Sequence, residues 1–162
     1  MLSESTCFFL GNHNSPESVF PILSAAIEQH IREFNITSFV VGHYGHFDRM
    51  AARAVSELKK AYPFITLSVL LPYHPAERPF TLPPDFDDSI YPFELEHIPK
   101  ILAIPRANRY MIKHCGFFIT YCEDTTGNTF RFLQYAYGRA KQGLLHIEDL
   151  TTRVPNKTDP GQ

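Results

Sequence analysis

The architecture of this chain follows from ten consecutive residues, Phe39-Val40-Val41-Gly42-His43-Tyr44-Gly45-His46-Phe47-Asp48. A short apolar, β-branched run leads into two glycines three residues apart, and a helical pattern begins at Asp48. This order predicts a strand, a tight turn and a helix N-terminus. Such a turn directs backbone N–H groups and the positive end of a helix dipole toward one point, which favours an anion such as a nucleotide phosphate. The spacing matches neither the G-x-G-x-x-G dinucleotide fingerprint nor the P-loop.

The overall composition limits the classes of protein that need to be considered. The 162 residues fit one domain, and an apolar content of 44% argues against general disorder. A formal net charge of −2 gives no reason to expect nucleic-acid or membrane binding through bulk charge. Three cysteines make no disulfide framework, and no run of residues reads as a signal peptide or membrane span. We therefore expect a cytoplasmic domain.

Apolar runs and helical patterns alternate along most of the sequence. Strands are predicted at residues 6–10, 38–41, 65–71, 116–121 and 144–147, with a short one at 101–104. Helices are predicted at residues 16–34, 48–62, 108–115 and 130–141. This alternation predicts an α/β fold, a Rossmann-like three-layer α/β/α sandwich with a mainly parallel sheet. Residues 1–150 form its single domain, and the polar residues 151–162 read as a frayed, flexible tail.

Three turns follow predicted strands and are expected to meet at one edge of the sheet. They comprise residues 11–13, 42–48 and 124–129, and ligands of such sheets bind at the carboxyl ends of strands. The proline-rich residues 72–92 interrupt the alternation of strands and helices. A stretch of this kind is either a long ordered surface loop or a functional segment, such as a lid or a partner-binding arm.

The order of these motifs resembles a known family over roughly residues 6–150. A strand with G-x-x-G-F-D-like residues precedes an apolar strand ending in Leu71-Pro72. Asn108-Arg109-Tyr110-Met111 follows, and then a further apolar strand and a Gly-x-Thr turn before a helix. This pattern is similar to the YpsA-like branch of the SLOG superfamily, which is related to DprA/Smf and Lonely Guy phosphoribohydrolase proteins.

The resemblance implies binding of a nucleotide or nucleotide-derived ligand without a further cofactor. Gly42, Gly45 and Asp48 match the glycine-rich loop of the family, and Asn108, Arg109 and Met111 match its R-N-x-x-M-like segment. Gly127 and Thr129 match its second phosphate-side turn, which is usually Gly-Gly-Thr. With the neighbouring turn residues, the candidate ligand-binding set is Gly11, Asn12, Gly42, His43, Tyr44, Gly45, Asp48, Asn108, Arg109, Gly127, Asn128 and Thr129.

The departures from the family pattern favour a non-catalytic or sensory role. Lonely Guy enzymes carry an Arg four residues before the Met, where this chain has Ala107, and a Glu shortly after the Gly-Thr turn, where this chain has Phe130-Arg131-Phe132. An alternative is an N-glycosidic hydrolase acting on nucleoside monophosphates, with Asp48, Glu123 or Asp124 as the acid. A further alternative is a protein-interaction module with a vestigial pocket, using the proline-rich arm and an aromatic helix.

Other residue groups have competing structural explanations. His43, His46 and Asp48 lack a fourth ligand, so no metal site is predicted, and Asp48 is also a candidate helix N-cap. Asn108 is a second candidate cap at the start of its helix. The three cysteines read as apolar fill rather than nucleophiles. The aromatic residues crowding 130–137 exceed one core-facing stripe, which makes this helix a candidate homodimer interface.

Overall fold

A six-stranded sheet forms the centre of the molecule in the computed structural model, which describes residues 4–42 and 45–153. The strands are β1 (Thr6–Gly11), β2 (Ser38–Val41), β3 (Thr66–Leu70), β4 (Asp88–Ile90), β5 (Phe117–Tyr121) and β6 (His146–Asp149). The α-helices are α1 (Phe20–Phe34), α2 (His46–Leu58), α3 (Ala103–His114) and α4 (Asn128–Lys141). Short 3-10 helices lie at Glu17–Val19, Phe93–Leu95 and Lys100–Leu102.

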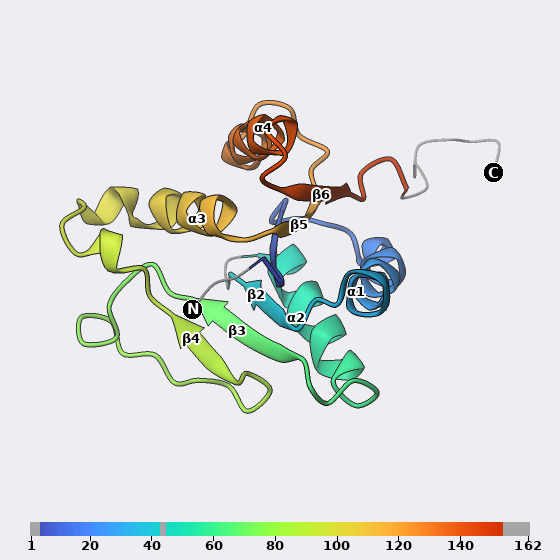
Figure 1. Ribbon diagram of the computed structural model, residues 1–162. Coiled ribbons are helices and arrows are strands. Elements are labelled where there is room, and N and C mark those ends of the chain that lie inside the picture. Colours follow the sequence, from blue (N-terminus) through green and yellow to red (C-terminus); the bar gives the residue numbers. More distant parts are fainter. Residues whose placement is uncertain (1–3, 43–44, 154–162) are drawn as a thin grey trace.

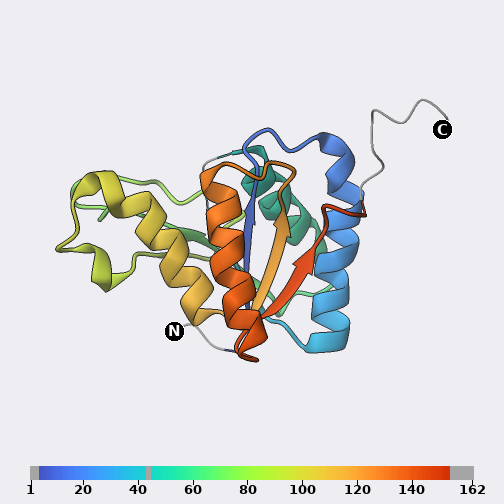
Figure 2. The same ribbon diagram turned by 90° about the horizontal axis from the view of Figure 1, so that it is seen from above.

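All neighbouring strands of the sheet are parallel, in the order β4-β3-β2-β1-β5-β6. From β1 the chain steps outward through β2 and β3 to β4. It then returns to the other side of β1 to form β5 and β6. Helices α1 and α2 cover one face of the sheet, and α3 and α4 cover the other (Figures 1 and 2). The predicted three-layer Rossmann-like architecture is therefore confirmed.

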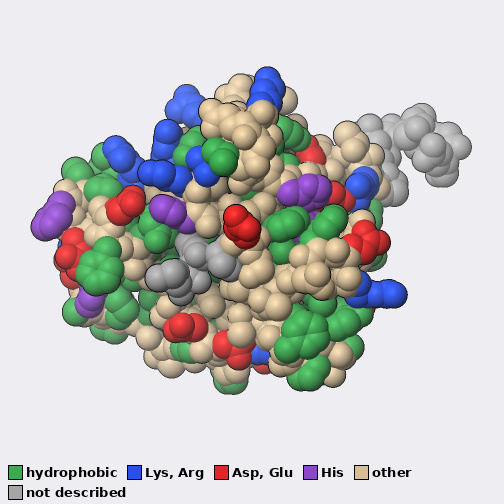
Figure 3. Space-filling model, viewed as in Figure 1, with side chains coloured by type: hydrophobic (Ala, Val, Ile, Leu, Met, Phe, Trp, Pro, Cys, Tyr) green, Lys and Arg blue, Asp and Glu red, His purple; other side chains and the backbone are tan. Residues whose placement is uncertain are grey.

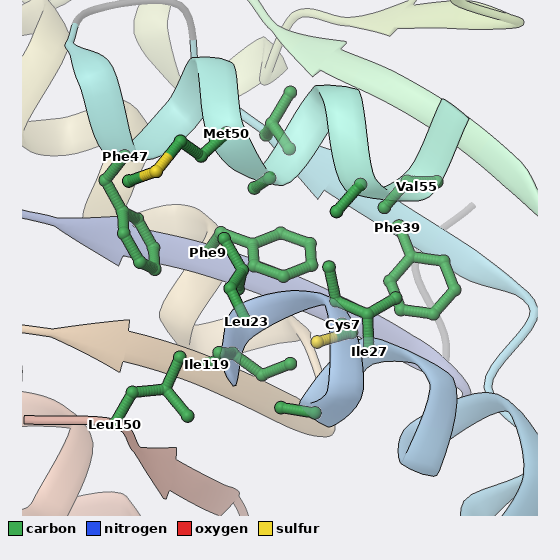
Figure 4. Close-up of a cluster of buried hydrophobic side chains, with 14 of the residues drawn as sticks. Cys7, Phe9, Leu23, Ile27, Phe39, Phe47, Met50, Val55, Ile119 and Leu150 are labelled. Carbon is green, nitrogen blue, oxygen red and sulfur yellow. The ribbon is translucent and has the colours of Figure 1, made fainter. Parts of the chain in front are cut away.

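Alternating strand residues supply two hydrophobic cores, one on each face of the sheet. Cys7 and Phe9 of β1 point toward α1 and α2, where they pack with Phe39, Phe47 and other buried side chains (Figure 4). Phe8 points the opposite way and packs against Phe118 at 6.1 Å between ring centres, beneath α3 and α4. Because both faces of β1 are buried, its sequence is apolar at every position from Cys7 to Leu10.

Helix α3 begins earlier than the sequence predicted. Residues 101–104 are not a strand: Ile101 belongs to a 3-10 helix, and α3 starts at Ala103. Pro105 then falls in the first turn of α3, where the missing N–H costs nothing because it would have no acceptor within the helix. Asn108 consequently lies in the middle of α3, so the prediction that it caps this helix was wrong.

The proline-rich segment connects β3 to β4 without a crossover helix, although parallel strands are usually joined by one. Its end is fixed by Asp87, whose carboxylate accepts hydrogen bonds from the Leu67 N–H at 2.8 Å and from Lys59 Nζ at 2.6 Å. The three-residue strand β4, which the sequence did not predict, then pairs with β3. The segment and the 3-10 helices that follow it extend to one side of the sheet (Figures 1 and 2).

The aromatic residues of α4 make contacts within the chain. Phe130, Phe132 and Tyr135 pack against the core beneath α3 and α4. Tyr137 is 41% exposed, and its hydroxyl donates to Asp149 Oδ2 at 3.1 Å. These contacts account for most of the aromatic excess, and the homodimer stays a prediction.

His30 is a titratable side chain buried with no exposure beneath β6. Its Nδ1–H donates to the Ala26 carbonyl at 2.7 Å, and its ring packs edge-on against Phe34 and Phe117. Nε2 has no hydrogen-bond partner among the residues described. Burial lowers the pKa of His30 from 6.5, and His146 lowers it further, while the Ala26 carbonyl, Glu148 and Glu33 oppose the shift.

We expect this buried ring to make folding sensitive to acid. The folded chain keeps His30 neutral over a pH range in which the unfolded chain protonates it, because its folded pKa lies below 6.5. The contribution of His30 to the free energy of unfolding is therefore complete above pH 6.5 and is lost as the pH falls through the folded pKa. Urea unfolding at pH values from about 7.5 down to about 5 should show that the free energy of unfolding falls less steeply for His30→Phe than for the unchanged chain. Exposed His97→Gln serves as the control, and equal slopes for all three proteins would contradict the expectation.

Candidate functional site

A cleft of about 310 Å³ lies at the carboxyl edge of the sheet, where β1, β2 and β3 end. Helices α2, α3 and α4 complete its walls. The lining residues are Leu10, Gly11, His13, Gly42, Asp48, Leu70, Pro72, Ile101, Ile104, Pro105, Ala107, Asn108, Asn128, Thr129 and Phe132. The three predicted turns contribute to this lining, as expected for a parallel α/β sheet.

The lining of the cleft combines apolar and polar side chains. The apolar part of the lining, called the apolar wall below, suits a flat, weakly polar group and comprises Leu10, Leu70, Ile101, Ile104, Pro105 and Phe132. The polar lining consists of His13, Asp48, Asn108, Asn128 and Thr129. No Lys or Arg belongs to the described part of the lining.

The end of β1 is shaped by a close contact between Gly11 and Phe47. A Cβ atom at Gly11 would lie only 2.4 Å from Phe47 Cγ, so any larger residue would collide with the ring. The ring belongs to the first turn of α2, which this contact seats directly on the end of β1. The glycine therefore allows β1 and α2 to approach closely at the edge of the cleft.

Asp48 is a carboxylate in the first turn of α2 and is only 8% exposed. A Cβ atom at Gly42 would lie 3.0 Å from Asp48 Oδ2, so Gly42 leaves room for this carboxylate beside the end of β2. Gly45, with φ of 142°, is the N-cap of α2, and the prediction that Asp48 caps the helix was wrong. Asp48 instead lies where the helix dipole stabilises negative charge.

The turns after β1 and β2 are joined to each other. The His46 N–H donates to the His13 carbonyl at 3.0 Å, and Gly45 lies against the His13 side chain. His46 Nε2 also lies 2.8 Å from Glu17 Oε2, which extends the connection to the 3-10 helix before α1. The two turns consequently form one rim of the cleft.

The N-terminus of α4 forms the opposite rim. Gly127 is its N-cap, and Asn128 and Thr129 of the first turn line the cleft. The preceding turn is ordered by Asp124, whose Oδ1 accepts hydrogen bonds from the Thr126 N–H at 2.9 Å and hydroxyl at 2.8 Å. The first turn of α4 contains no acidic residue, and the nearest described carboxylate is that of Asp124 beside the N-cap, where a Cβ atom on Gly127 would lie 3.2 Å from Asp124 Oδ2.

Six of the predicted binding residues line the cleft, namely Gly11, Gly42, Asp48, Asn108, Asn128 and Thr129. Gly45 and Gly127 support it as helix N-caps. His43 and Tyr44 lie outside the described residues.

Asn12 and Arg109 have structural contacts away from the lining. Asn12 Oδ1 accepts from the Glu123 N–H at 2.7 Å, and the Asn12 N–H donates to the Tyr121 carbonyl at 3.0 Å, so this residue joins the ends of β1 and β5. The Arg109 guanidinium stacks 4.2 Å from the ring centre of Tyr135, between α3 and α4.

Sequence reasoning missed one polar residue and most of the apolar wall. His13 belongs to the first predicted turn, and its place directly after Gly11-Asn12 was a usable signal. Ile101, Ile104 and Pro105 approach the cleft from the start of α3, a region assigned to a strand. Phe132 was considered only among the crowded aromatic residues of its helix, whereas it lines the cleft.

The side chains at the end of β5 remain protonated. The Tyr121 hydroxyl donates to Glu123 Oε1, and burial together with this carboxylate raises the pKa of Tyr121. Burial also raises the pKa of Cys122, whose thiol donates to the Asp124 carbonyl at 3.0 Å. Burial raises the pKa of Cys115 to about 12. The cysteines therefore lack the thiolate character of a nucleophile.

Three carboxylates were candidates for acid catalysis. Of these, Asp48 lines the described cleft, whereas Glu123 and Asp124 do not. Among the residues described, no group of three or more His, Cys, Asp or Glu side chains is arranged to hold a metal ion. None of the described helices is both long enough and apolar enough to cross a membrane.

In the comparisons, no protein-family model and no curated protein matched this chain.

Proposed function

We propose that this chain binds a nucleotide or nucleotide-derived ligand in the cleft at the carboxyl edge of its sheet, as a SLOG-like binding or sensory domain. One observation carries the proposal: apolar side chains line the same cleft as a helix N-terminus that has no acidic residue in its first turn. A base and a phosphate need these two environments within one ligand length of each other.

The lining residues suggest a role for each part of the ligand. The base packs against Phe132 and Ile104, where Asn108 supplies both donors and acceptors for its edge. The phosphate accepts hydrogen bonds from the first N–H groups of α4, beside Asn128 and Thr129. The Asp48 carboxylate accepts hydrogen bonds from ribose hydroxyls.

The charges around the cleft restrict the ligand further. With no Lys or Arg in the described lining and one buried carboxylate, Asp48, the site compensates little negative charge. Backbone N–H groups and a helix dipole stabilise a single phosphate, whereas a triphosphate is usually held by additional Lys, Arg or a metal ion. We therefore favour a ligand with one phosphate or a masked diphosphate.

Asn128→Asp should weaken binding of phosphate-bearing ligands about tenfold without destabilising the fold. The new carboxylate repels the phosphate, yet an acidic residue in the first turn of α4 interacts favourably with the helix dipole. Isothermal titration would compare nucleoside monophosphates, ADP-ribose and the parent nucleosides. Gln134→Glu, an equal charge change at an exposed position of the same helix outside the cleft, should leave affinity unchanged. Failure of the folded chain to bind any of these compounds would contradict the proposal.

Hydrolysis of an N-glycosidic bond is a second candidate function, and the position of Asp48 favours it. This carboxylate lines the cleft and lies mostly out of solvent, where an acid or base group can reach a bound ligand. Release of free base from a nucleoside monophosphate in the same titrations would identify this activity. Intact ligand recovered after prolonged incubation would exclude it for the compounds used.

A further inference from the structure

A second cleft, of about 450 Å³, lies beside the first on the irregular segment that follows β3. Pro72 lines both clefts, so they are neighbours at the same edge of the sheet. The walls of the second cleft come from the residues after β3, from Tyr91 after β4, and from the 3-10 helices before α3. Hydrophobic, acidic and histidine side chains share the surface over this part of the molecule, on the left of Figure 3.

We propose that this second cleft binds a small organic cation, such as an alkylammonium, quaternary ammonium or guanidinium group. Its lining combines the aromatic rings of Tyr73, His74 and Tyr91 with the carboxylates of Glu77 and Glu96, and it also includes His97 and Lys100. Aromatic faces attract cations through the negative potential above the ring, and nearby carboxylates add direct charge attraction. The proposal is independent of the ligand in the first cleft.

The chain itself shows that one of these rings accepts a cation. The Arg78 guanidinium lies 3.8 Å from the ring centre of Tyr73, within the range of a cation–π contact. Arg78 does not belong to the lining of the cleft.

The aromatic wall is held in place before any ligand arrives. His74 Nδ1 accepts a hydrogen bond from the Ala76 N–H at 3.0 Å, which places the proton of the neutral ring on Nε2. The His74 ring meets Tyr91 edge-on, with ring centres 5.2 Å apart. A cation entering the cleft therefore meets rings already arranged, and little side-chain entropy is lost on binding.

The carboxylates leave negative charge available to a ligand. Glu77 lies 3.6 Å from Lys100, but both side chains are more than half exposed, so this pair is weak. Within residues 4–42 and 45–153, Glu96 forms no ion pair. Burial raises the pKa of Tyr91, and the charges of Glu96 and Glu77 raise it further.

Choline and its uncharged isostere 3,3-dimethylbutanol provide the test. NMR titration of the full chain with choline should shift the signals of Tyr73 and Tyr91, and the isostere should bind at least about fivefold more weakly because it lacks the charge. Glu96→Gln, which keeps the shape of the side chain, should weaken choline binding by a similar factor. Glu94→Gln, in the 3-10 helix that Glu96 caps but outside the cleft, is the matched control and should leave binding unchanged.

Tyr91→Leu supplies an independent check because leucine keeps an apolar wall but removes the aromatic face. Binding of choline should weaken in this variant while binding of the isostere stays the same. Any one of three results would overturn the proposal. These are equal affinity for choline and its isostere, choline binding by Glu96→Gln that is as tight as that of the unchanged chain, and the absence of signal shifts at Tyr73 and Tyr91. Circular dichroism spectra of all variants establish that each one is folded.

Discussion

Gly11→Ala is expected to destabilise the chain by about 1–3 kcal/mol and to weaken ligand binding in the first cleft. The added methyl group would lie 2.4 Å from Phe47 Cγ, and Phe47 is only 1% exposed, so its ring has little space into which to move. Relief of this collision requires the first turn of α2 to shift, and that turn carries Asp48 into the cleft. One substitution should therefore lower both the urea midpoint and the affinity for nucleotides.

Gly138→Ala is the matched control for this effect. Gly138 lies inside α4, and a Cβ atom there would have no neighbour within 4 Å. Because alanine favours a helix over glycine, this variant should gain about 0.5–1 kcal/mol in its free energy of unfolding. A Gly11→Ala protein as stable as the unchanged chain would show that β1 and α2 do not pack as closely as described.

Phe118→Ala is expected to cost about 3–5 kcal/mol, a large share of the stability of a domain of this size. Phe118 has no exposure and packs edge-on against Phe8 in the core beneath α3 and α4. Truncation leaves a cavity between two adjacent central strands, where backbone pairing on both sides limits collapse. Urea unfolding followed by circular dichroism would measure the loss.

Phe64→Ala provides the comparison at the surface. Phe64 is 59% exposed, and its replacement should change the free energy of unfolding by no more than about 0.5 kcal/mol. A loss of less than about 1 kcal/mol for Phe118→Ala would contradict the position of this ring in the core. Similar losses for both variants would indicate that α3 and α4 are not packed tightly on the sheet.

The fold could be predicted from the sequence because its signals are local. Each central strand is a short apolar run, such as Phe39-Val40-Val41, and each is followed by a turn and a helical pattern. The carboxyl ends of parallel strands meet at one edge by geometry. For this reason Gly11, Gly42, Asp48, Asn128 and Thr129 could be placed together although they are far apart in sequence.

The apolar wall of the cleft could not be predicted in this way. Ile101, Ile104 and Pro105 reach the cleft from a 3-10 helix and the first turn of α3. These elements follow the irregular connection between β3 and β4, whose path depends on long-range contacts such as that between Asp87 and Leu67. Two further binding predictions concern residues whose side chains found partners within the protein. Asn12 accepts a hydrogen bond from Glu123, and Arg109 stacks on Tyr135. Because each partner is distant in sequence, local patterns could not predict these contacts.

The position of β1 between β2 and β5 has a consequence for the way the chain becomes folded during synthesis. Strands β1 to β4 emerge first and can pair with one another, but β1 keeps an open edge until β5 is complete at Tyr121. Until then, an apolar strand edge is available to other chains, which is a recognised route to aggregation. Closing that edge also builds the opposite rim of the cleft, since α4 directly follows β5. Protection from misassociation and completion of the cleft are therefore acquired in the same late step.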